Sequence, residues 1–310
     1  MRTRPLTLSA AALLSGFLSV AAITTNGEGI FVPNFVTSTV TRFDSSGNGS
    51  VFASGLASAT GLAFDGSGNL YVACNDPNNI VKLDSSGHAS VFAHWGVWEA
   101  EGMAFDRSGN LYVANVYDNT IVRFDQNGNG SVFASGLSSP TGLACDSAGN
   151  LYVANRGNST IYEFDAGGHR SIFASGLLGP INGLTFGSGG NLFLTTQGLN
   201  NTIEEFDSAG HGSVFPTSGL IPRVPWGLSF DSSGNLFVVD AYSGFGQVVK
   251  FDSTGHGSFF ADIPGAGGSF IAVQPVPEPS AFAVLGLGMG ALAGRWWRST
   301  ARWWGWCQPS

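Results

Sequence analysis

The sequence is short of charge and short of the residues that favour helices. Charged residues make up only 11% of the chain, and 13 Lys and Arg against 21 Asp and Glu leave a net charge of −8. Five of the basic residues lie near the two ends, so the body between them is more acidic than the whole: Arg2, Arg4, Arg295, Arg298 and Arg302. An acidic surface repels phosphate backbones, which argues against nucleic acid as a partner.

Cysteine is also scarce, with Cys74, Cys145 and Cys307 as the whole set. An odd and sparse set of cysteines does not make a disulfide framework. Cys145 stands where other repeats of the chain have Phe64 and Phe105, so we expect it to be a small buried hydrophobic residue.

Two kinds of catalytic motif are missing from the sequence. No Gly-rich phosphate loop leads from a strand into a helix, and no nucleophile-elbow motif occurs. The sequence therefore predicts no catalytic residue. What is abundant is Gly (45 residues) and Phe (24 residues), a composition typical of many short strands separated by tight turns.

The N-terminal 22 residues have the pattern of a secretory signal peptide. Arg2 and Arg4 precede an apolar run over residues 6–20, and small residues follow through Ala22. This order of charged, apolar and small residues is that of a signal peptide, so residues 1–22 are predicted to be removed on export.

The C-terminal residues 276–310 carry a second export pattern. Pro277, Glu278 and Pro279 precede an apolar stretch over residues 281–294, which is followed by a basic and Trp-rich tail. The stretch would give roughly 21–25 Å of helix, slightly short of a membrane core. The segment resembles the PEP-CTERM sorting signal of Gram-negative bacteria. The resemblance implies processing by an exosortase after transient membrane insertion, and display on the outer surface or in the extracellular matrix. The alternative is an ordinary C-terminal membrane anchor.

Between these ends, one pentapeptide returns at steps of about 40 residues. It begins at the glycines Gly61, Gly102, Gly142, Gly183 and Gly227, and reads Gly-Leu-Ala-Phe-Asp with small variations. Repeats of this period are typical of four-stranded propeller blades. In the repeat that starts at Gly102, the predicted strands are residues 102–106, 110–115, 120–125 and 131–134, which we call strands a to d.

The first repeat lacks a strand a, and residues 270–273 lie where a further strand a is due. We therefore predict that the C-terminal strand completes the N-terminal blade and closes the ring, because closure protects strand edges. The sequence predicts an all-β protein, a six-bladed β-propeller over residues 23–275 with four antiparallel strands per blade. The repeats resemble NHL-repeat and SMP-30/gluconolactonase-like propellers, a resemblance that is specific for fold and weak for function.

The residues just before each strand a are the first place to look for chemistry. Chain direction puts the d-to-a and b-to-c loops on one face, and the resemblance implies that strand a is innermost. We therefore expect six residues to ring the mouth of the central channel: Thr60, Glu101, Thr141, Asn182, Trp226 and Ser269.

A metal site at this ring is implied only by the resemblance. SMP-30-type lactonases hold a divalent cation with Glu, Asn and Asp side chains at these positions, which makes Glu101 and Asn182 candidate ligands for Ca²⁺, Mg²⁺, Mn²⁺ or Zn²⁺. Trp226 stands where the family has its Asp, so the negative charge available is small. The alternative is that Glu101 is a solvated rim charge and Asn182 a turn residue.

Aromatic residues mark a second candidate site. The loop over residues 94–101 contains Trp95, Trp98 and Glu99 where sibling loops have small residues, and a longer loop three blades on contains Arg223 and Trp226. Flat aromatic faces with charged neighbours suit a sugar or an aromatic ligand. The alternative is that the Trp side chains form a plug over the channel.

The histidines at one repeat position are predicted to be turn residues. They follow the Gly of the c-to-d turn at the outer rim, too far apart for one metal ion to bridge: His88, His169, His211 and His256. The loop from Asp44 to Gly49 lacks the acidic residue that ends a calcium loop, so it too is predicted to be a hairpin turn.

These patterns favour an exported binding module for a glycan such as exopolysaccharide, or for a protein, over an enzyme. The rival hypothesis is a metal-dependent lactonase, or a related lyase, that uses Glu101 and Asn182. A third is a structural spacer in an extracellular matrix.

Overall fold

The computed structural model describes residues 28–94, 96–198, 201–242, 245–266 and 269–275, and almost all of their regular structure is β-strand. Residues 1–22, residues 276–310 with Pro277, Glu278 and Pro279, and Trp95 fall outside these ranges. Among the described residues, no helix combines the length and the hydropathy that crossing a membrane requires.

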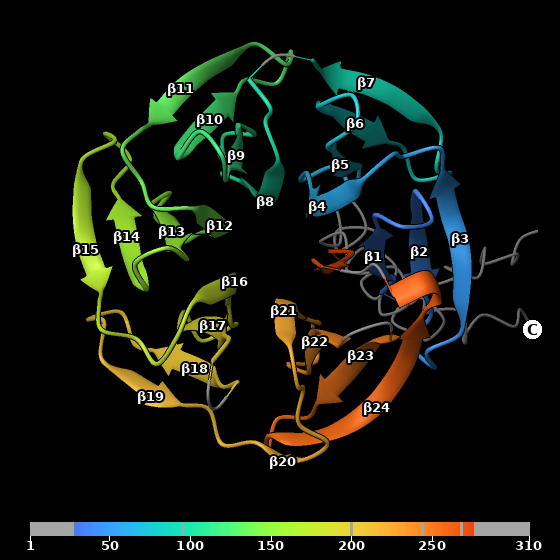
Figure 1. The fold of residues 1–310 in the computed structure, drawn as a ribbon, viewed down its shortest axis with the longest axis vertical. Helices are drawn as coiled ribbons and strands as arrows, with labels where there is room; N and C mark the ends of the chain where they lie inside the picture. Colours follow the sequence, from blue (N-terminus) through green and yellow to red (C-terminus); the bar gives the residue numbers. More distant parts are fainter. Residues whose placement is uncertain (1–27, 95, 199–200, 243–244, 267–268, 276–310) are drawn as a thin grey trace, which may run out of the picture.

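Six antiparallel blades surround one axis, with strand a innermost and strand d outermost (Figure 1). Blade 1 contains β25 (Ala272–Val273), β1 (Ile30–Asn34), β2 (Thr39–Phe43) and β3 (Gly49–Ser54). Blade 2 contains β4 (Ala59–Phe64), β5 (Leu70–Cys74), β6 (Asn79–Leu83) and β7 (Ala89–Ala93). Blade 3 contains β8 (Ala100–Phe105), β9 (Leu111–Asn115), β10 (Thr120–Phe124) and β11 (Gly130–Ala134).

The second half of the ring repeats this order. Blade 4 contains β12 (Pro140–Cys145), β13 (Leu151–Asn155), β14 (Thr160–Phe164) and β15 (Arg170–Ala174). Blade 5 contains β16 (Ile181–Phe186), β17 (Leu192–Thr196), β18 (Ile203–Phe206) and β19 (Gly212–Val214). Blade 6 contains β21 (Pro225–Phe230), β22 (Leu236–Tyr242), β23 (Phe245–Phe251) and β24 (His256–Ile263), with β20 (Ser218–Gly219) added in parallel to the outer edge of β24 and a 3₁₀ turn, η1 (Pro264–Ala266), after it.

The ring closes as predicted, by pairing of the two ends of the propeller. Ile30 pairs with Val273, and Phe31 with Ala272, so β25 serves as the innermost strand of blade 1. The Gln274 amide donates to the Gly29 carbonyl oxygen at 2.9 Å, which extends the pairing by one more bond. With β25 in place, blade 1 has four strands, and the predicted six-bladed propeller is confirmed.

The innermost strands begin earlier than the sequence pattern indicated. β8 starts at Ala100, where the pattern predicted a start at Gly102, because Ala100 already pairs with Asn115 before a register shift interrupts the ladder. Glu101 therefore lies within a strand, beside that irregularity. The same register shift occurs in blades 2, 4, 5 and 6. Five of the six ring residues therefore lie within inner strands, beside these irregularities.

The core is divided into six apolar layers, one between each pair of neighbouring blades. In four of the six blades, the aromatic residue of strand b makes edge contacts with two Phe rings. Tyr71, for example, meets Phe92 of its own blade at 4.9 Å and Phe105 of the next blade at 4.8 Å between centroids. Such pairs contribute about 0.5–1.5 kcal/mol each beyond area burial. Cys145 takes the place of that second Phe beside Tyr112, and both Cys74 and Cys145 are free thiols.

The glycine that opens each pentapeptide sets the distance between neighbouring inner strands. A Cβ atom on Gly61 would collide with the Glu101 carbonyl oxygen, and one on Gly102 would collide with that of Thr141. Because these obstacles are backbone atoms, they cannot move aside as a flexible side chain could. The inner strands therefore pack backbone against backbone around the axis.

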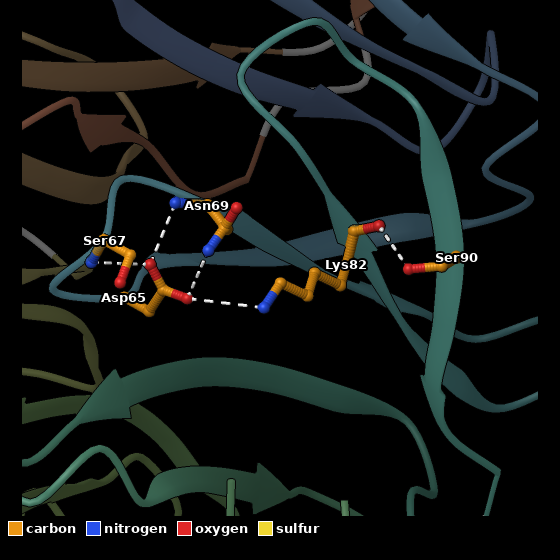
Figure 2. A network of polar contacts seen from close by, with 5 residues as sticks. All are labelled: Asp65, Ser67, Asn69, Lys82 and Ser90. Atoms are coloured by element: carbon orange, nitrogen blue, oxygen red, sulfur yellow. Dashed lines mark hydrogen bonds and ion pairs between the residues drawn. The ribbon is translucent and has the colours of Figure 1, made fainter. Parts of the chain in front are cut away.

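The hairpin turns are built on aspartate, as Figure 2 shows for blade 2. One Asp65 carboxylate oxygen accepts the amides of Ser67 and Asn69, each at 2.9 Å, and the other accepts the Asn69 side chain at 2.7 Å. Lys82 Nζ lies 3.7 Å from the same carboxylate. Burial alone would raise the pKa of Asp65, but these hydrogen bonds and the Lys82 charge hold the pKa below its ordinary value.

Antiparallel connection sorts the loops into two faces. We call the b–c turns and the d–a connections the mouth face; its described residues fall in 35–38, 55–58, 75–78, 94–99, 116–119, 135–139, 156–159, 175–180, 197–202, 221–224 and 264–271. We call the opposite hairpins, which carry the Asp turns, the turn face. Both ends of the described chain lie on the turn face, where Glu28 accepts the Ser232 amide at 2.9 Å.

Candidate functional site

Most of the six ring residues fasten one blade to the next. Thr60 Oγ1 donates to the Ala100 carbonyl oxygen at 2.6 Å, Thr141 Oγ1 to that of Ile181 at 3.0 Å, and Asn182 Nδ2 to that of Pro225 at 2.8 Å. Ser269 Oγ donates to the Thr60 carbonyl oxygen at 3.5 Å. This role explains why small polar residues recur at this position. Glu101 and Trp226 make no hydrogen bond of this kind among the described residues, so they are the two members of the ring that depart from the structural pattern.

The Glu101 carboxyl group sits in a poorly solvated place. Its Oε2 atom is buried and has no hydrogen-bond partner among the described residues. Burial raises the pKa of Glu101 to about 7, although the Arg156 guanidinium works in the opposite direction and Glu99 adds to the rise. Near neutral pH this carboxyl group is thus divided between its neutral and ionised forms.

Arg156 is the residue that the sequence analysis missed. It begins the b–c turn of blade 4, and its Nη2 atom donates to Gln197 Oε1 of blade 5 at 3.3 Å. Its guanidinium also lies 5.2 Å from the centre of the Trp226 ring of blade 6. Arg156 therefore reaches across the mouth face and joins side chains from several blades. The available signal was its charge, because the b–c turns of the other described blades begin with uncharged residues.

Asn182 provides a second bare acceptor. The side chain is fully buried, its Nδ2 atom is used by Pro225, and its Oδ1 atom has no partner among the described residues. Carboxylate and amide oxygens such as these are ligands that a hard cation accepts, but Glu101 and Asn182 lie in blades 3 and 5, with blade 4 between them. The nearby Arg156 guanidinium opposes a bound cation, since it already places a positive charge beside Glu101. No cluster of three or more His, Cys, Asp or Glu side chains occurs within the described ranges.

The aromatic loop before β8 is held between two blades. Asn115 Oδ1 accepts the Trp98 amide at 3.1 Å, and Asn115 Nδ2 donates to the Gly96 carbonyl oxygen at 2.7 Å. On the other side, Asn75 Oδ1 accepts the Ala100 amide at 3.0 Å. The Trp98 side chain is 56% exposed, and Glu99 is also exposed. The loop is thus fixed at its backbone, with its large side chain directed to solvent.

The longer loop before β21 is fixed by a buried carboxylate. Asp240 is 1% exposed, and its Oδ1 atom accepts the amides of Arg223 at 3.1 Å and Val224 at 2.8 Å. Arg223 is exposed, and its guanidinium lies 5.1 Å from the centre of the Tyr242 ring. Both cationic side chains of this half of the mouth face, Arg156 and Arg223, therefore rest on aromatic rings.

The predicted ligand-binding residues fall into two groups across the ring. Trp98 and Glu99 lead into β8 of blade 3, whereas Arg223 and Trp226 belong to blade 6, whose β21 faces β8 across the axis (Figure 1). A cavity of about 90 Å³ beside the second group is lined partly by Ile203, Ile221 and Pro222. That volume is far below the roughly 300 Å³ of a small-molecule site, so a ligand held by these residues would lie on the open surface.

Exposed apolar side chains show where that surface lies. The large apolar side chains that are exposed among the described residues form two sets. One set lies on the outermost strands: Val51, Val91, Val132, Ile172, Val214 and Phe259. The other lies on or beside the mouth face: Phe35, Val36, Trp98, Tyr117, Leu178, Ile221 and Tyr242. Leu220 lies at the outer edge of blade 6, where its amide donates to the Gly257 carbonyl oxygen of β24 at 2.9 Å. The described turn-face hairpins contribute none.

The histidines of the c–d turns are placed as predicted. The Nδ1 atoms of His88, His169 and His211 lie 2.9–3.2 Å from the Asp four residues earlier, and their side chains are exposed. His256 lies beside Ser218 Oγ at 3.4 Å. The first three are turn residues, and His256 is the first residue of β24, directly after its turn. Asp44 is also a turn residue, since its carboxylate accepts the amides of Ser46 and Asn48.

Comparison with known proteins supports the fold and leaves the activity open. No protein-family model matches the chain, and no curated protein matches its sequence. Among solved structures, a chain of a nidogen/laminin complex has a TM-score of 0.71 at 20% identity, covering 82% of this chain and 100% of that one. A virginiamycin B lyase from Staphylococcus aureus has a TM-score of 0.61 at 14% identity, covering 81% and 94%. A gluconolactonase from Xanthomonas campestris has a TM-score of 0.58 at 20% identity, covering 68% and 78%. At these identities the similarity shows a shared six-bladed propeller fold only.

Proposed function

We propose that this chain is an exported, non-catalytic β-propeller that binds a glycan or protein ligand on its mouth face. The observation that carries the proposal is the unequal distribution of exposed apolar side chains. Apart from the outermost strands and Leu220 at the outer edge of β24, they lie on or beside the mouth face, whereas the turn face consists mostly of Asp-based hairpins. Exposed aromatic and apolar side chains gathered on one side of a protein are typical of an interaction surface.

The topology also suits presentation of the mouth face. The described chain enters at Glu28 and leaves at Pro275 on the turn face, opposite the mouth face. If residues 276–310 attach the protein to a membrane or to an envelope polymer, the mouth face points away from the attachment. We therefore propose display at the outer surface or in the matrix of a Gram-negative bacterium, with an exosortase acting near Pro277, Glu278 and Pro279. Mass spectrometry of the extracellular form tests this, because it should end close to these residues.

The binding proposal is tested with the purified full-length chain on a glycan array and in pull-downs from the producing culture. Ligands that bind the wild type should be lost in the variants Trp98→Ser or Trp226→Ala. Val132→Ser is the matched control, since Val132 is 58% exposed on the outermost strand of blade 3, away from the mouth face. A ligand that is retained by both Trp variants, or no ligand at all from a folded protein, would contradict the proposal.

The second candidate function is a metal-dependent lactonase or a related lyase. It is favoured by the bare oxygens on Glu101 and Asn182, which would hold Ca²⁺, Mg²⁺, Mn²⁺ or Zn²⁺. Such a cation would supply Lewis-acid chemistry when bound. Metal analysis of the purified protein separates the two candidates. A stoichiometric divalent ion that is present in the wild type and lost in Glu101→Ala would favour the metal-dependent enzyme. Only trace metal in both the wild type and the variant would favour the binding module.

A further inference from the structure

Two neighbouring loops of blade 3 each present an aromatic residue followed by an acidic one. Trp98 and Glu99 lie in the connection into β8, and Tyr117 and Asp118 lie in the turn between β9 and β10. Trp98 is 56% and Tyr117 70% exposed, and both acidic side chains are exposed as well. We call these four residues the blade 3 platform.

Hydrogen bonds hold the two loops side by side. The Val116 amide donates to the Glu99 carbonyl oxygen at 3.3 Å, and Asn115 joins the loops through the Trp98 amide. The loop that carries Trp98 is also tied to blade 2 through Asn75. The backbone under the platform is therefore ordered before any partner arrives, which lowers the entropic cost of binding.

The platform is a departure from the repeat. Trp98 stands where Ala57 and Ser138 stand in the loops of blades 2 and 4, and Glu99 stands where Ser58 and Ser139 stand. These sibling residues adopt the same left-handed backbone as Glu99, with φ values of 53° and 46° against 42°. Small residues therefore satisfy the fold at these positions, and the aromatic and acidic side chains of blade 3 are not needed for it.

Among the described residues, no Lys or Arg side chain lies over the rings of Trp98 and Tyr117, whereas three Arg side chains rest on other rings. Arg156 rests on Trp226, Arg223 on Tyr242, and Arg170 on Tyr162. In contrast, residues 94–101 and 115–120 contain acidic residues and no Lys or Arg, and the neighbouring turn of blade 2 adds Asp76. Of the two Arg side chains on the mouth face, Arg223 belongs to blade 6, across the ring, and Arg156 belongs to the neighbouring blade 4 but rests on Trp226 of blade 6.

We propose that the blade 3 platform binds Lys or Arg side chains of an extended segment of a partner protein. This inference rests on the proposed binding function and names its partner chemistry. A cation placed over an aromatic face is attracted by the ring, and an adjacent carboxylate adds a hydrogen-bonded ion pair. The platform's charged groups are all acceptors, so they match cationic donors better than the mixed donors and acceptors of a neutral sugar. Trp and Tyr are also the residues that most often dominate protein interfaces.

The test measures binding of synthetic peptides to the purified full-length chain by fluorescence anisotropy. The probes are a peptide of alternating Arg and Ser, its Lys counterpart, its Glu counterpart, and a chitosan oligomer as a cationic sugar polymer. We expect the Arg and Lys peptides to bind and the Glu peptide not to bind. Affinity should fall as salt rises from about 50 mM to about 500 mM, because exposed charges are screened.

Variants locate the binding on the platform. Trp98→Ser combined with Tyr117→Ser should weaken the Arg peptide about tenfold, from the loss of two cation–π contacts. Glu99→Gln combined with Asp118→Asn should weaken it about fivefold, from the loss of two exposed ion pairs. Asp262→Asn is the control, because it removes one negative charge from an exposed position of blade 6 and should leave the affinity unchanged.

Three results would overturn the inference. Equal binding of the Arg peptide by all variants would mean nonspecific attraction to an acidic protein. Binding of chitosan without binding of the Arg and Lys peptides would assign the platform to a glycan. Binding of none of these cationic probes would leave the platform without a ligand. The proposed function is judged separately. If a ligand found in the screens depends on Trp226 but not on Glu99 and Asp118, the binding module stands and only this inference fails.

Discussion

Replacing Glu101 by Gln should remove a pH-dependent cost from the stability of the protein. The Glu101 carboxyl group has an ordinary pKa of 4.5, and burial raises this pKa to about 7 in the folded state. A difference of this size corresponds to about 3 kcal/mol between the protonation states. Because the folded state holds the proton more tightly than the unfolded state, stability is highest below the unfolded pKa. It is then lost as pH rises through the folded pKa.

The assay is chemical denaturation followed by Trp fluorescence at a series of pH values. Below about pH 5 the wild type and Glu101→Gln should have similar free energies of unfolding, and at about pH 8 the variant should be more stable by about 3 kcal/mol. Subtracting the two profiles cancels the other titrating groups. Val132→Ser, which removes no titrating group, is the control, and its profile should run parallel to that of the wild type. Parallel profiles for Glu101→Gln would refute the reasoning, because burial of the charge would then cost nothing.

The same measurement tests the metal hypothesis. A divalent cation held by Glu101 and Asn182 would stabilise the ionised carboxylate, so adding it would abolish the wild type's loss of stability at high pH. Under the binding-module proposal, added Ca²⁺, Mg²⁺, Mn²⁺ or Zn²⁺ should leave the difference between the wild type and Glu101→Gln unchanged.

Three further predictions follow from the packing. Asn115→Ala and Asn155→Ala each leave loop backbone groups unpaired, which should lower the free energy of unfolding by about 1–3 kcal/mol per group. Only Asn115→Ala should also weaken the binding of the Arg peptide, because only this variant releases the Trp98 loop. Gly102→Ala should cost at least about 1–3 kcal/mol from its collision with the Thr141 carbonyl, whereas Gly66→Ala, which meets no atom within 4 Å, should leave the melting temperature nearly unchanged. Ile271→Ala removes a side chain that is 6% exposed in the layer between blades 6 and 1, and should lower the free energy of unfolding by about 2–5 kcal/mol. An unchanged midpoint of unfolding in urea would contradict the closure of the ring.

The fold could be predicted because the same sequence features recur from one repeat to the next. Five blades have a Gly where the next inner strand passes, most hairpins turn on an Asp, and in four blades an aromatic residue of strand b meets two Phe rings. These features are local and recur every 40 residues or so, which makes them visible in the sequence. The missing strand a of the first repeat and the extra one near residue 272 left only one way to close the ring, and the pairing of β1 with β25 confirms it.

The candidate site was predicted only in part. Glu101 and Trp226 were recognised as departures from the repeat, but Arg156 was missed because its significance depends on side chains of other blades. Thr60, Thr141 and Asn182 were counted as site candidates, yet each donates a hydrogen bond that fastens the next blade. A single repeat does not reveal this role, since both partners of each bond look ordinary in the sequence.

By itself, the sequence determined the number of blades, the order of strands within them and the face on which each loop emerges. Those features depend on period, turn chemistry and chain direction, all of which act between near neighbours in the chain. Only the tertiary structure decided that Glu101 loses most of its water, that Arg156 lies against Trp226, and that Trp98 and Tyr117 share one surface. Solvation, charge proximity and shared exposure depend on distances between residues far apart in the chain, and those distances exist only once the ring has closed.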